Sequence, residues 1–214
     1  HRMYEKQEDV WYYLTLYNEN ISHPPMPGGA EEGILRGLYL FRPAEERLRH
    51  HVGLFGSGAI MQGVLRAQEL LAEKFRVSSD VWSATSYQQL RNEALSADRW
   101  NRLHPESPPR VPYVAEVLDG ARGPFVAATD FMKALPEMIR PWLPGRLVAL
   151  GTDGYGRSDT REALRRFFEV DAESIVIAAL HALAQEGAIP PARVAEAIRD
   201  LGVDPDKPDP IDCG

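Results

Sequence analysis

Short apolar runs alternate along this chain with longer stretches in which apolar side chains recur every three or four residues. A run that is apolar on both faces predicts a buried strand, and the longer spacing predicts an amphipathic helix. The run at residues 34–41 alternates partly with polar side chains, so we expect that strand at an edge of the sheet. The predicted strands cover residues 34–41, 52–55, 80–86, 124–129 and 146–150.

Capping residues and glycines predict where the intervening helices begin and end. Ser86 and Gln89 form a capping box for a helix that runs to about Leu103. Gly187 and Gly202 are placed to end the last two helices. Other helix starts are predicted after Gly58, near Tyr113, after Asp130, near Thr160, after Asp171 and at Pro191. Strands that alternate with helices predict an α/β fold: a three-layer, doubly wound, mostly parallel five-stranded sheet with helices on both faces.

The stretch at residues 146–187 organises this prediction. Its strand is followed by a glycine-rich turn, and Ser158 and Asp159 then offer oxygens to the free N–H groups of the next helix. A strand, a glycine turn and a helix form the carboxyl edge of a sheet, where α/β domains place ligands. The candidate crevice or interface residues are Asp130, Asp153, Gly154, Tyr155, Arg157 and Ser158.

Asp130 and Asp153 both follow predicted parallel strands. Two carboxylates at one sheet edge can share a proton or hold a cation. Each residue also has a local explanation, because Asp130 is placed to cap a helix and Asp153 to form a turn before Gly154. We favour the local explanation, which requires no ligand.

Other candidate motifs fail on inspection. Residues 56–58 (GSG) follow a strand as in a dinucleotide site, but Met61 stands where a glycine is needed. The acidic residue expected at the end of the next strand is also missing, since Asp80 is predicted to begin that strand. The GSG sequence is not a nucleophile elbow either. The six histidines show no metal-ligand spacing, and we expect His181 to be a packed or half-exposed helix residue.

Composition narrows the classes of function. The net charge of −7 makes the chain a poor partner for nucleic acid or an acidic membrane. The one cysteine, Cys213, rules out an internal disulfide and favours a reducing compartment, and we expect a cytoplasmic location. The charged N-terminus lacks the apolar core of a signal peptide, and no apolar run is long enough to span a bilayer.

The chain opens with aromatic and β-branched side chains at residues 9–17, which predict a buried strand. A proline- and glycine-rich linker follows. We therefore assign residues 1–17 to the last strand of a preceding domain, 18–32 to a linker and 33–214 to the domain proper. Such a strand would expose a large apolar patch alone, so we expect it to lie against a second copy of the chain, its own domain or missing domains.

The chain resembles the C-terminal part of homodimeric, bacterial-type pyruvate dehydrogenases, which are transketolase-like enzymes. The resemblance rests on residues 13–19 (YLTLYNE), 33–37 (GILRG), 79–86 (SDVWSATS), 110–114 (RVPYV) and 150–159 (LGTDGYGRSD). It implies a C-terminal α/β domain that follows two thiamine-binding domains, and a homodimer whose partner is the dihydrolipoyl acetyltransferase component. The full-length enzyme would decarboxylate pyruvate and reductively acetylate a lipoyl group.

In this family thiamine diphosphate and Mg²⁺ are bound by the preceding domains. The resemblance therefore implies no catalytic, cofactor-binding or metal residue in this chain, and we expect the chain alone to be inactive. Two alternatives stay open. One is the C-terminal domain of a different, transketolase-like thiamine enzyme, and the other is a stand-alone interaction module that binds an anion at the glycine turn.

Overall fold

The structure, a computed structural model, describes residues 1–14, 16–18, 20–22 and 24–212. At its centre is a five-stranded sheet with the order β1-β3-β2-β4-β5. Strand β1 pairs with β3 in antiparallel fashion, and every other pairing is parallel. The strands are β1 Leu38–Arg42, β2 His50–Gly56, β3 Val77–Ala84, β4 Phe125–Ala128 and β5 Leu147–Leu150. The predicted α/β fold and the edge position of the first strand are confirmed.

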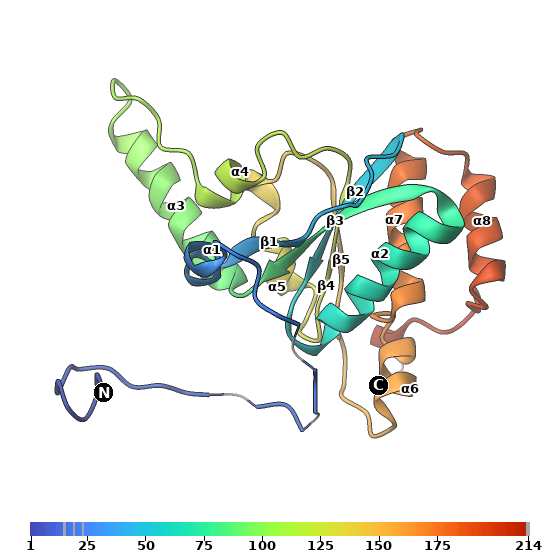
Figure 1. Cartoon of the computed structure of the whole chain (residues 1–214), viewed down its shortest axis with the longest axis horizontal. Coiled ribbons are helices and arrows are strands. Elements are labelled where there is room, and N and C mark those ends of the chain that lie inside the picture. Colours follow the sequence, from blue (N-terminus) through green and yellow to red (C-terminus); the bar gives the residue numbers. More distant parts are fainter. Residues whose placement is uncertain (15, 19, 23, 213–214) are drawn as a thin grey trace.

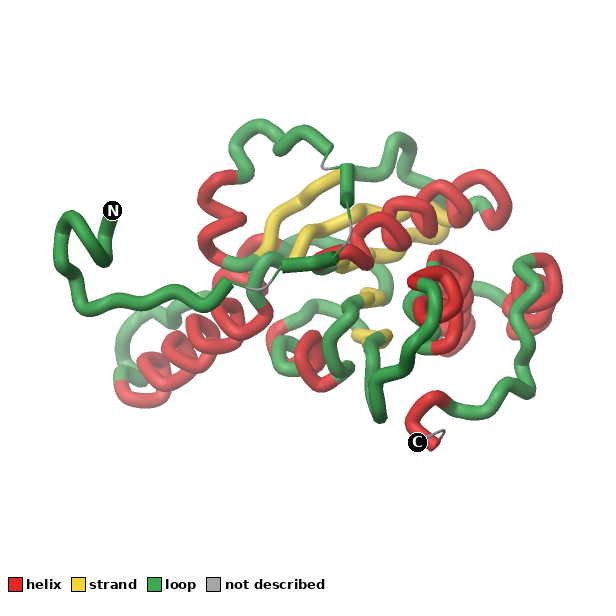
Figure 2. Tube along the Cα trace, turned by 90° about the horizontal axis from the view of Figure 1, so that it is seen from below, coloured by secondary structure: helices red, strands yellow, loops and turns green. Residues whose placement is uncertain are grey.

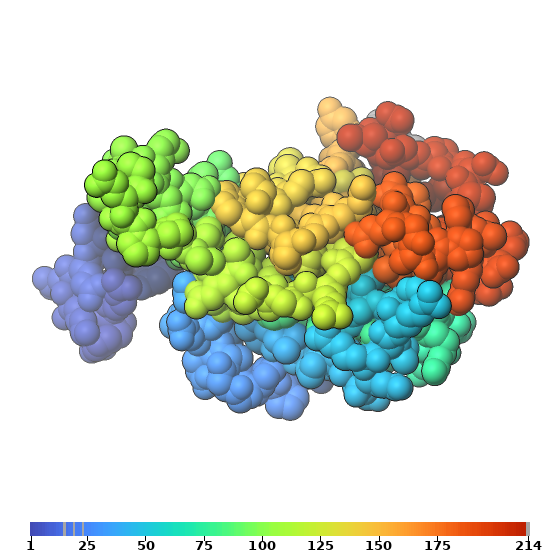
Figure 3. Space-filling model, turned by 90° about the horizontal axis from the view of Figure 1, so that it is seen from above, coloured from blue at the N-terminus to red at the C-terminus, as the bar shows by residue number. Residues whose placement is uncertain are grey.

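Helices cover both faces of this sheet (Figures 1 and 2). One face carries α2, α7 and α8, and the other carries α3, α4 and α5. The helices are α1 Glu31–Arg36, α2 Met61–Phe75, α3 Tyr87–Leu103, α4 Tyr113–Val117, α5 Ala134–Glu137, α6 Arg161–Phe167, α7 Ala172–Gln185 and α8 Pro191–Asp200. Helix α3 and the loop behind it project away from the sheet (Figures 1 and 3).

Strand β4 shows why the sheet needs two helical layers. Val126 and Ala128 face the core built by α2, α7 and α8, whereas Phe125 and Ala127 face the core on the other side. All four side chains are at most 1% exposed. Because side chains alternate along a strand, an apolar run of this kind is stable only where both faces are covered. Burial of Phe125 alone contributes roughly 2–3 kcal/mol.

Several predicted helix boundaries are confirmed. The hydroxyl of Ser86 accepts a hydrogen bond of 3.1 Å from the backbone N–H of Gln89 at the start of α3. The carboxylate of Asp171 accepts one of 2.9 Å from Ser174 at the start of α7. Gly187 follows the end of α7 with a φ of +73°, the left-handed conformation that glycine adopts without strain.

Other boundaries were wrong. The run at residues 34–41 is divided: its first part belongs to α1, which Gly37 ends with a φ of +107°, and its second part is β1. The signals for α1 are the acidic first turn of EEGILRG and the glycine after it. Strand β3 begins at Val77, so Asp80 lies inside the strand and not at its start.

Two predicted caps were also wrong. Asp130 caps no helix, because α5 begins at Ala134. Helix α6 begins at Arg161, and its cap is Thr160, whose side chain accepts a hydrogen bond of 3.3 Å from the backbone N–H of Ala163. Ser158 therefore lies outside the helix that it was predicted to cap.

The predicted strand at residues 9–17 does not form in the described part of that segment. Trp11 is 78% exposed, Tyr13 82% and Leu16 91%, and the segment extends away from the domain (Figures 1 and 2). A strand needs a neighbour that satisfies its backbone groups, and none of the described residues of this segment pairs with the five-stranded sheet. Thr15, Glu19, His23 and Cys213, which entered the sequence predictions, lie outside the described residues.

Candidate functional site

The carboxyl edge of the sheet, where α/β domains bind ligands, is tied together by its own side chains. Ser57, behind β2, donates a hydrogen bond of 2.9 Å to the hydroxyl of Thr129, behind β4. The Thr129 hydroxyl oxygen also accepts a bond of 3.2 Å from the backbone N–H of Phe131, and Thr129 is fully buried. These bonds fix the relative positions of the two strand ends.

Asp153 has a structural role, although its bonds reach Lys133 on another loop and do not close the turn before Gly154 that we expected. One carboxylate oxygen accepts a hydrogen bond of 3.1 Å from the backbone N–H of Lys133, and the other lies 3.9 Å from the ammonium nitrogen of the same residue. The adjacent N–H of Thr152 donates to the carbonyl of Phe131 over 2.9 Å. Asp153 thus holds the loop behind β4 against the loop behind β5.

Asp130 has different surroundings. Its Oδ1 atom is buried and accepts no hydrogen bond within the described part of the chain. The phenol of Tyr17, from the N-terminal segment, lies beside it and over Gly58. Burial of the hydroxyl, and next the neighbouring Asp130 carboxylate, raise the pKa of Tyr17 to about 12. The two predicted carboxylates therefore have separate neighbours: Lys133 beside Asp153 and Tyr17 beside Asp130.

The remaining candidate residues are only partly brought together. A cavity of about 330 Å³ at the carboxyl edge is lined by Asp130 and Arg157 among them, with Tyr17 on its wall. The guanidinium of Arg157 lies 4.4 Å from the ring centre of Phe167. Gly154 packs against the C-terminal tail, with a φ of +86°, while Tyr155 is 80% exposed and Ser158 is also exposed.

A second polar cluster, which sequence reasoning missed, lies toward the amino ends of the parallel strands. His51 Nε2 lies 3.2 Å from Asp80 Oδ2, and Arg47 lies 3.0 Å from the same oxygen. The backbone N–H of Ala44 donates to Asp80 Oδ1 over 2.9 Å. Burial would raise the pKa of Asp80, but its bonds to His51 and Ala44 and the charge of Arg47 outweigh burial and hold that pKa below its usual value.

This cluster superficially resembles a Ser–His–Asp triad. His51 Nδ1 lies 2.9 Å from the hydroxyl of Ser78. However, Ser78 is 2% exposed, and its hydroxyl accepts a bond of 3.1 Å from Leu48 N–H and lies 3.2 Å from the carbonyl of His50. A nucleophile must reach its substrate, and the buried hydroxyl of Ser78 cannot do so. The cluster instead holds the loop at residues 43–49 to the sheet. His51 and Ser78 meet because the register of β2 and β3 pairs them. The spacing of these residues in the sequence does not reveal that register.

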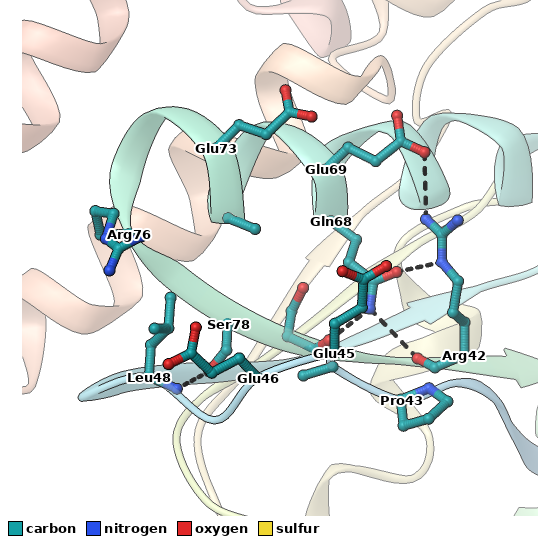
Figure 4. Close-up of a pocket in the computed structure, with 13 residues that line it drawn as sticks. Arg42, Pro43, Glu45, Glu46, Leu48, Gln68, Glu69, Glu73, Arg76 and Ser78 are labelled. Carbon is teal, nitrogen blue, oxygen red and sulfur yellow. Dashed lines mark hydrogen bonds and ion pairs between the residues drawn. The ribbon is translucent and has the colours of Figure 1, made fainter.

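A cavity of about 320 Å³ lies between that loop and α2 (Figure 4). Arg42 crosses one end of the cavity. Its guanidinium donates a hydrogen bond of 2.8 Å to the carbonyl of Leu65 and forms an ion pair of 3.6 Å with Glu69. The side-chain amide of the buried Gln68 donates a hydrogen bond of 2.6 Å to the carbonyl of Ser79. Arg42 and Gln68 thus fix one end of the cavity through their own bonds, and the carboxylates of Glu45, Glu46 and Glu73 line the rest of it.

A third cavity, of about 540 Å³, opens on the face seen in Figure 3, where the starts of β2 and β4 meet the end of α7. It is lined by Arg47, Arg49, His50, His51, Gly120, Arg122, Gly123, Leu183, Glu186 and others.

Among the residues that the structure describes, no group of three or more His, Cys, Asp or Glu side chains is placed to hold a metal ion. No helix in the described ranges is long and apolar enough to cross a membrane.

Comparison with known proteins agrees with this architecture. The chain is 51% identical to the pyruvate dehydrogenase E1 component of Pseudomonas aeruginosa over 99% of its length, and 49% identical to that of Escherichia coli K12 over 98%. It spans only about a quarter of those relatives, 24% and 23% respectively. A solved transketolase from Pichia stipitis superposes with a TM-score of 0.52 at 14% identity, covering 77% of this chain and 20% of that one, and shows the shared fold alone.

A family model described as "Transketolase-like TK C-terminal domain" matches residues 37–171. The matched range contains all five strands, together with the glycine turn behind β5. The match therefore covers the sheet and its carboxyl edge, the parts of the fold on which the candidate site depends. The chain belongs to the transketolase-like C-terminal domain family.

Proposed function

We propose that the chain is the C-terminal part of a pyruvate dehydrogenase E1 component. The observation that carries this proposal is an identity of about half over nearly the whole chain to proteins of that name. The parent enzyme would decarboxylate pyruvate with thiamine diphosphate and Mg²⁺ and reductively acetylate the lipoyl group of the acyltransferase component. We place the parent enzyme in the cytoplasm.

Within that enzyme we assign this domain a structural role. The polar clusters of the described residues are explained by bonds that hold loops to the sheet, as shown for Asp153 and Asp80. We propose that thiamine diphosphate and its metal ion are bound by parts of the parent that precede this chain. The exposed aromatic side chains of residues 9–14 support the assignment of residues 1–17 to the edge of the preceding domain.

We further propose that the domain contributes to a homodimer and meets the dihydrolipoyl acetyltransferase component through the assembled enzyme. The protruding α3 and the open edge of β1 are two surfaces on which such contacts can be built. Loss of the dimer in the parent after substitutions on these surfaces, measured by light scattering, is the expected result. A parent that stays dimeric after changes at both surfaces would remove this part of the proposal.

The assignment is tested by assaying the parent polypeptide for dye reduction with two donors. Pyruvate should support dye reduction that depends on thiamine diphosphate and Mg²⁺, and a ketose phosphate should not. Activity with the ketose phosphate and none with pyruvate would instead identify a transketolase. Absence of activity with both donors, in a parent that binds the cofactor, would also contradict the assignment.

A further inference from the structure

The junction between the N-terminal segment (residues 1–17) and the linker (residues 18–32) lies at the carboxyl edge of the sheet, at the lower ends of the strands in Figure 1, with Tyr17 47% exposed. Tyr17 is the residue that enters this edge. Its hydroxyl lies so close to Gly58 that a Cβ atom at that position would collide with it. Gly58 has a φ of +54°, a backbone conformation that also favours glycine. The turn behind β2 is therefore shaped to receive a side chain from elsewhere in the sequence.

The position is one that doubly wound domains commonly use for a ligand. Gly58 begins the helical turn that leads into α2, and in dinucleotide-binding folds the pyrophosphate lies at the helix behind the first glycine turn. In this chain the phenol of Tyr17 takes that place. Its hydroxyl lies beside the Asp130 carboxylate and near the backbone N–H of Ala59.

Two other contacts hold the same segment. The guanidinium of Arg161, in the first turn of α6, donates to the backbone carbonyl of Asn18, the residue after Tyr17. Ile60, Leu164, Phe168 and Val170 form an apolar wall beside the Tyr17 ring. A buried polar atom normally has a hydrogen-bond partner, and the unpartnered Oδ1 of Asp130 has the Tyr17 hydroxyl as its neighbour.

We propose that the carboxyl edge of this sheet is a seat for the junction between the N-terminal segment and the linker: Tyr17 occupies the position of a ligand, with Asp130 as the acceptor for its hydroxyl and Arg161 as the anchor of the next carbonyl. This linker clasp fixes the point at which the polypeptide leaves the domain toward the segments that precede it. The inference concerns contacts within the chain and does not depend on the proposed enzyme activity.

Limited proteolysis of the whole chain tests the clasp. Thermolysin cleaves before Ile21, which lies in the linker beyond the seat. Tyr17→Ala removes the ring and should raise the rate of that cleavage about tenfold or more, and Tyr17→Phe, which removes only the hydroxyl that the proposal pairs with Asp130, should raise it several-fold. Tyr13→Ala is the matched control, because Tyr13 belongs to the same segment and is 82% exposed. Equal cleavage rates in wild type, Tyr17→Ala and Tyr13→Ala would overturn the proposal.

A second measurement follows the phenol itself. With ¹³C-labelled tyrosine, the Cζ resonance of Tyr17, assigned by its loss in Tyr17→Phe, should remain that of the un-ionised phenol at pH 11, in line with a pKa of about 12. Asp130→Asn should move the midpoint toward lower pH, because the negative neighbour is removed. A Tyr17 that ionises with a midpoint near 10, unchanged by Asp130→Asn, would show that the ring lies in solvent and that no clasp exists.

Discussion

The carboxylate of Asp80 lies 3.2 Å from the imidazole of His51, and both side chains are almost fully shielded from solvent. Asp80 belongs to β3 and His51 to β2, so the contact joins adjacent parallel strands. The same carboxylate also bonds to Ala44 and pairs with Arg47, both in the loop between β1 and β2. One buried charge therefore organises the loop that follows the edge strand.

Asp80→Asn should destabilise the domain by about 2–3 kcal/mol at pH 7, because charge-assisted hydrogen bonds are lost from a shielded site. A carboxylate whose pKa is lowered on folding stabilises the folded state above its unfolded pKa, near 3.8, and that contribution disappears as the pH falls through the lower, folded pKa. The difference between variant and wild type should therefore be largest at neutral pH and shrink at about pH 3.

Urea unfolding at both pH values measures this difference. Asp119→Asn is the control, since Asp119 is exposed and should show little effect at either pH. An Asp80→Asn variant as stable as wild type at pH 7 would mean that the cluster contributes nothing to the fold. A loss of stability of equal size at pH 7 and pH 3 would mean that the contribution of Asp80 does not depend on its charge.

The N-cap of α6 is Thr160, whereas the sequence alone led us to expect Ser158 in that role. Thr160→Ala should lower the free energy of unfolding by about 1 kcal/mol, because the N–H of Ala163 loses its acceptor. Ser158→Ala, two positions earlier, should change it by less than about 0.5 kcal/mol. Urea midpoints of the two variants decide between them, and a larger effect at Ser158 would place the helix start elsewhere.

Glycine at position 53 is required by its neighbour on the next strand. A Cβ atom there would collide with the Phe125 ring, which also packs against Phe55 with ring centres 5.2 Å apart. Gly53→Ala should therefore cost about 1–3 kcal/mol through displaced core side chains. Gly156→Ala is the matched control, because nothing lies within 4 Å of a Cβ added at that position. Thermal unfolding that ranks Gly156→Ala as the more damaging change would contradict the packing described for β4.

The sheet was predictable from sequence because its strands are apolar on both faces. Phe125 and Val126 point to opposite cores, so the run at residues 124–129 fits no amphipathic helix. The helix α1 was missed because its apolar residues continue directly into β1, and Gly37 was the one local sign of a division. The described residues of the segment 9–17 form no strand in this chain, because a strand requires a partner, and the assignment of the segment to a preceding domain stays a prediction.

The site was less predictable than the fold. Asp130 and Asp153 were placed correctly at the carboxyl edge, since both follow parallel strands. What surrounds Asp130 depends on Tyr17, more than one hundred residues earlier in the chain, and no local pattern reports such a contact. The Asp80 cluster was missed for the same reason, because its members meet through strand register and a loop rather than through sequence spacing.

The central proposal is that the parent of this domain is a thiamine enzyme and that its cofactor is bound outside this chain. Calorimetric titration of the isolated chain and of the parent polypeptide with thiamine diphosphate and Mg²⁺ tests that claim most directly. The parent should bind the cofactor with a measurable heat. The isolated chain should show no heat of binding at cofactor concentrations up to about 1 mM, which means a binding free energy weaker than about −4 kcal/mol. Saturable, micromolar binding by the chain alone would contradict the account.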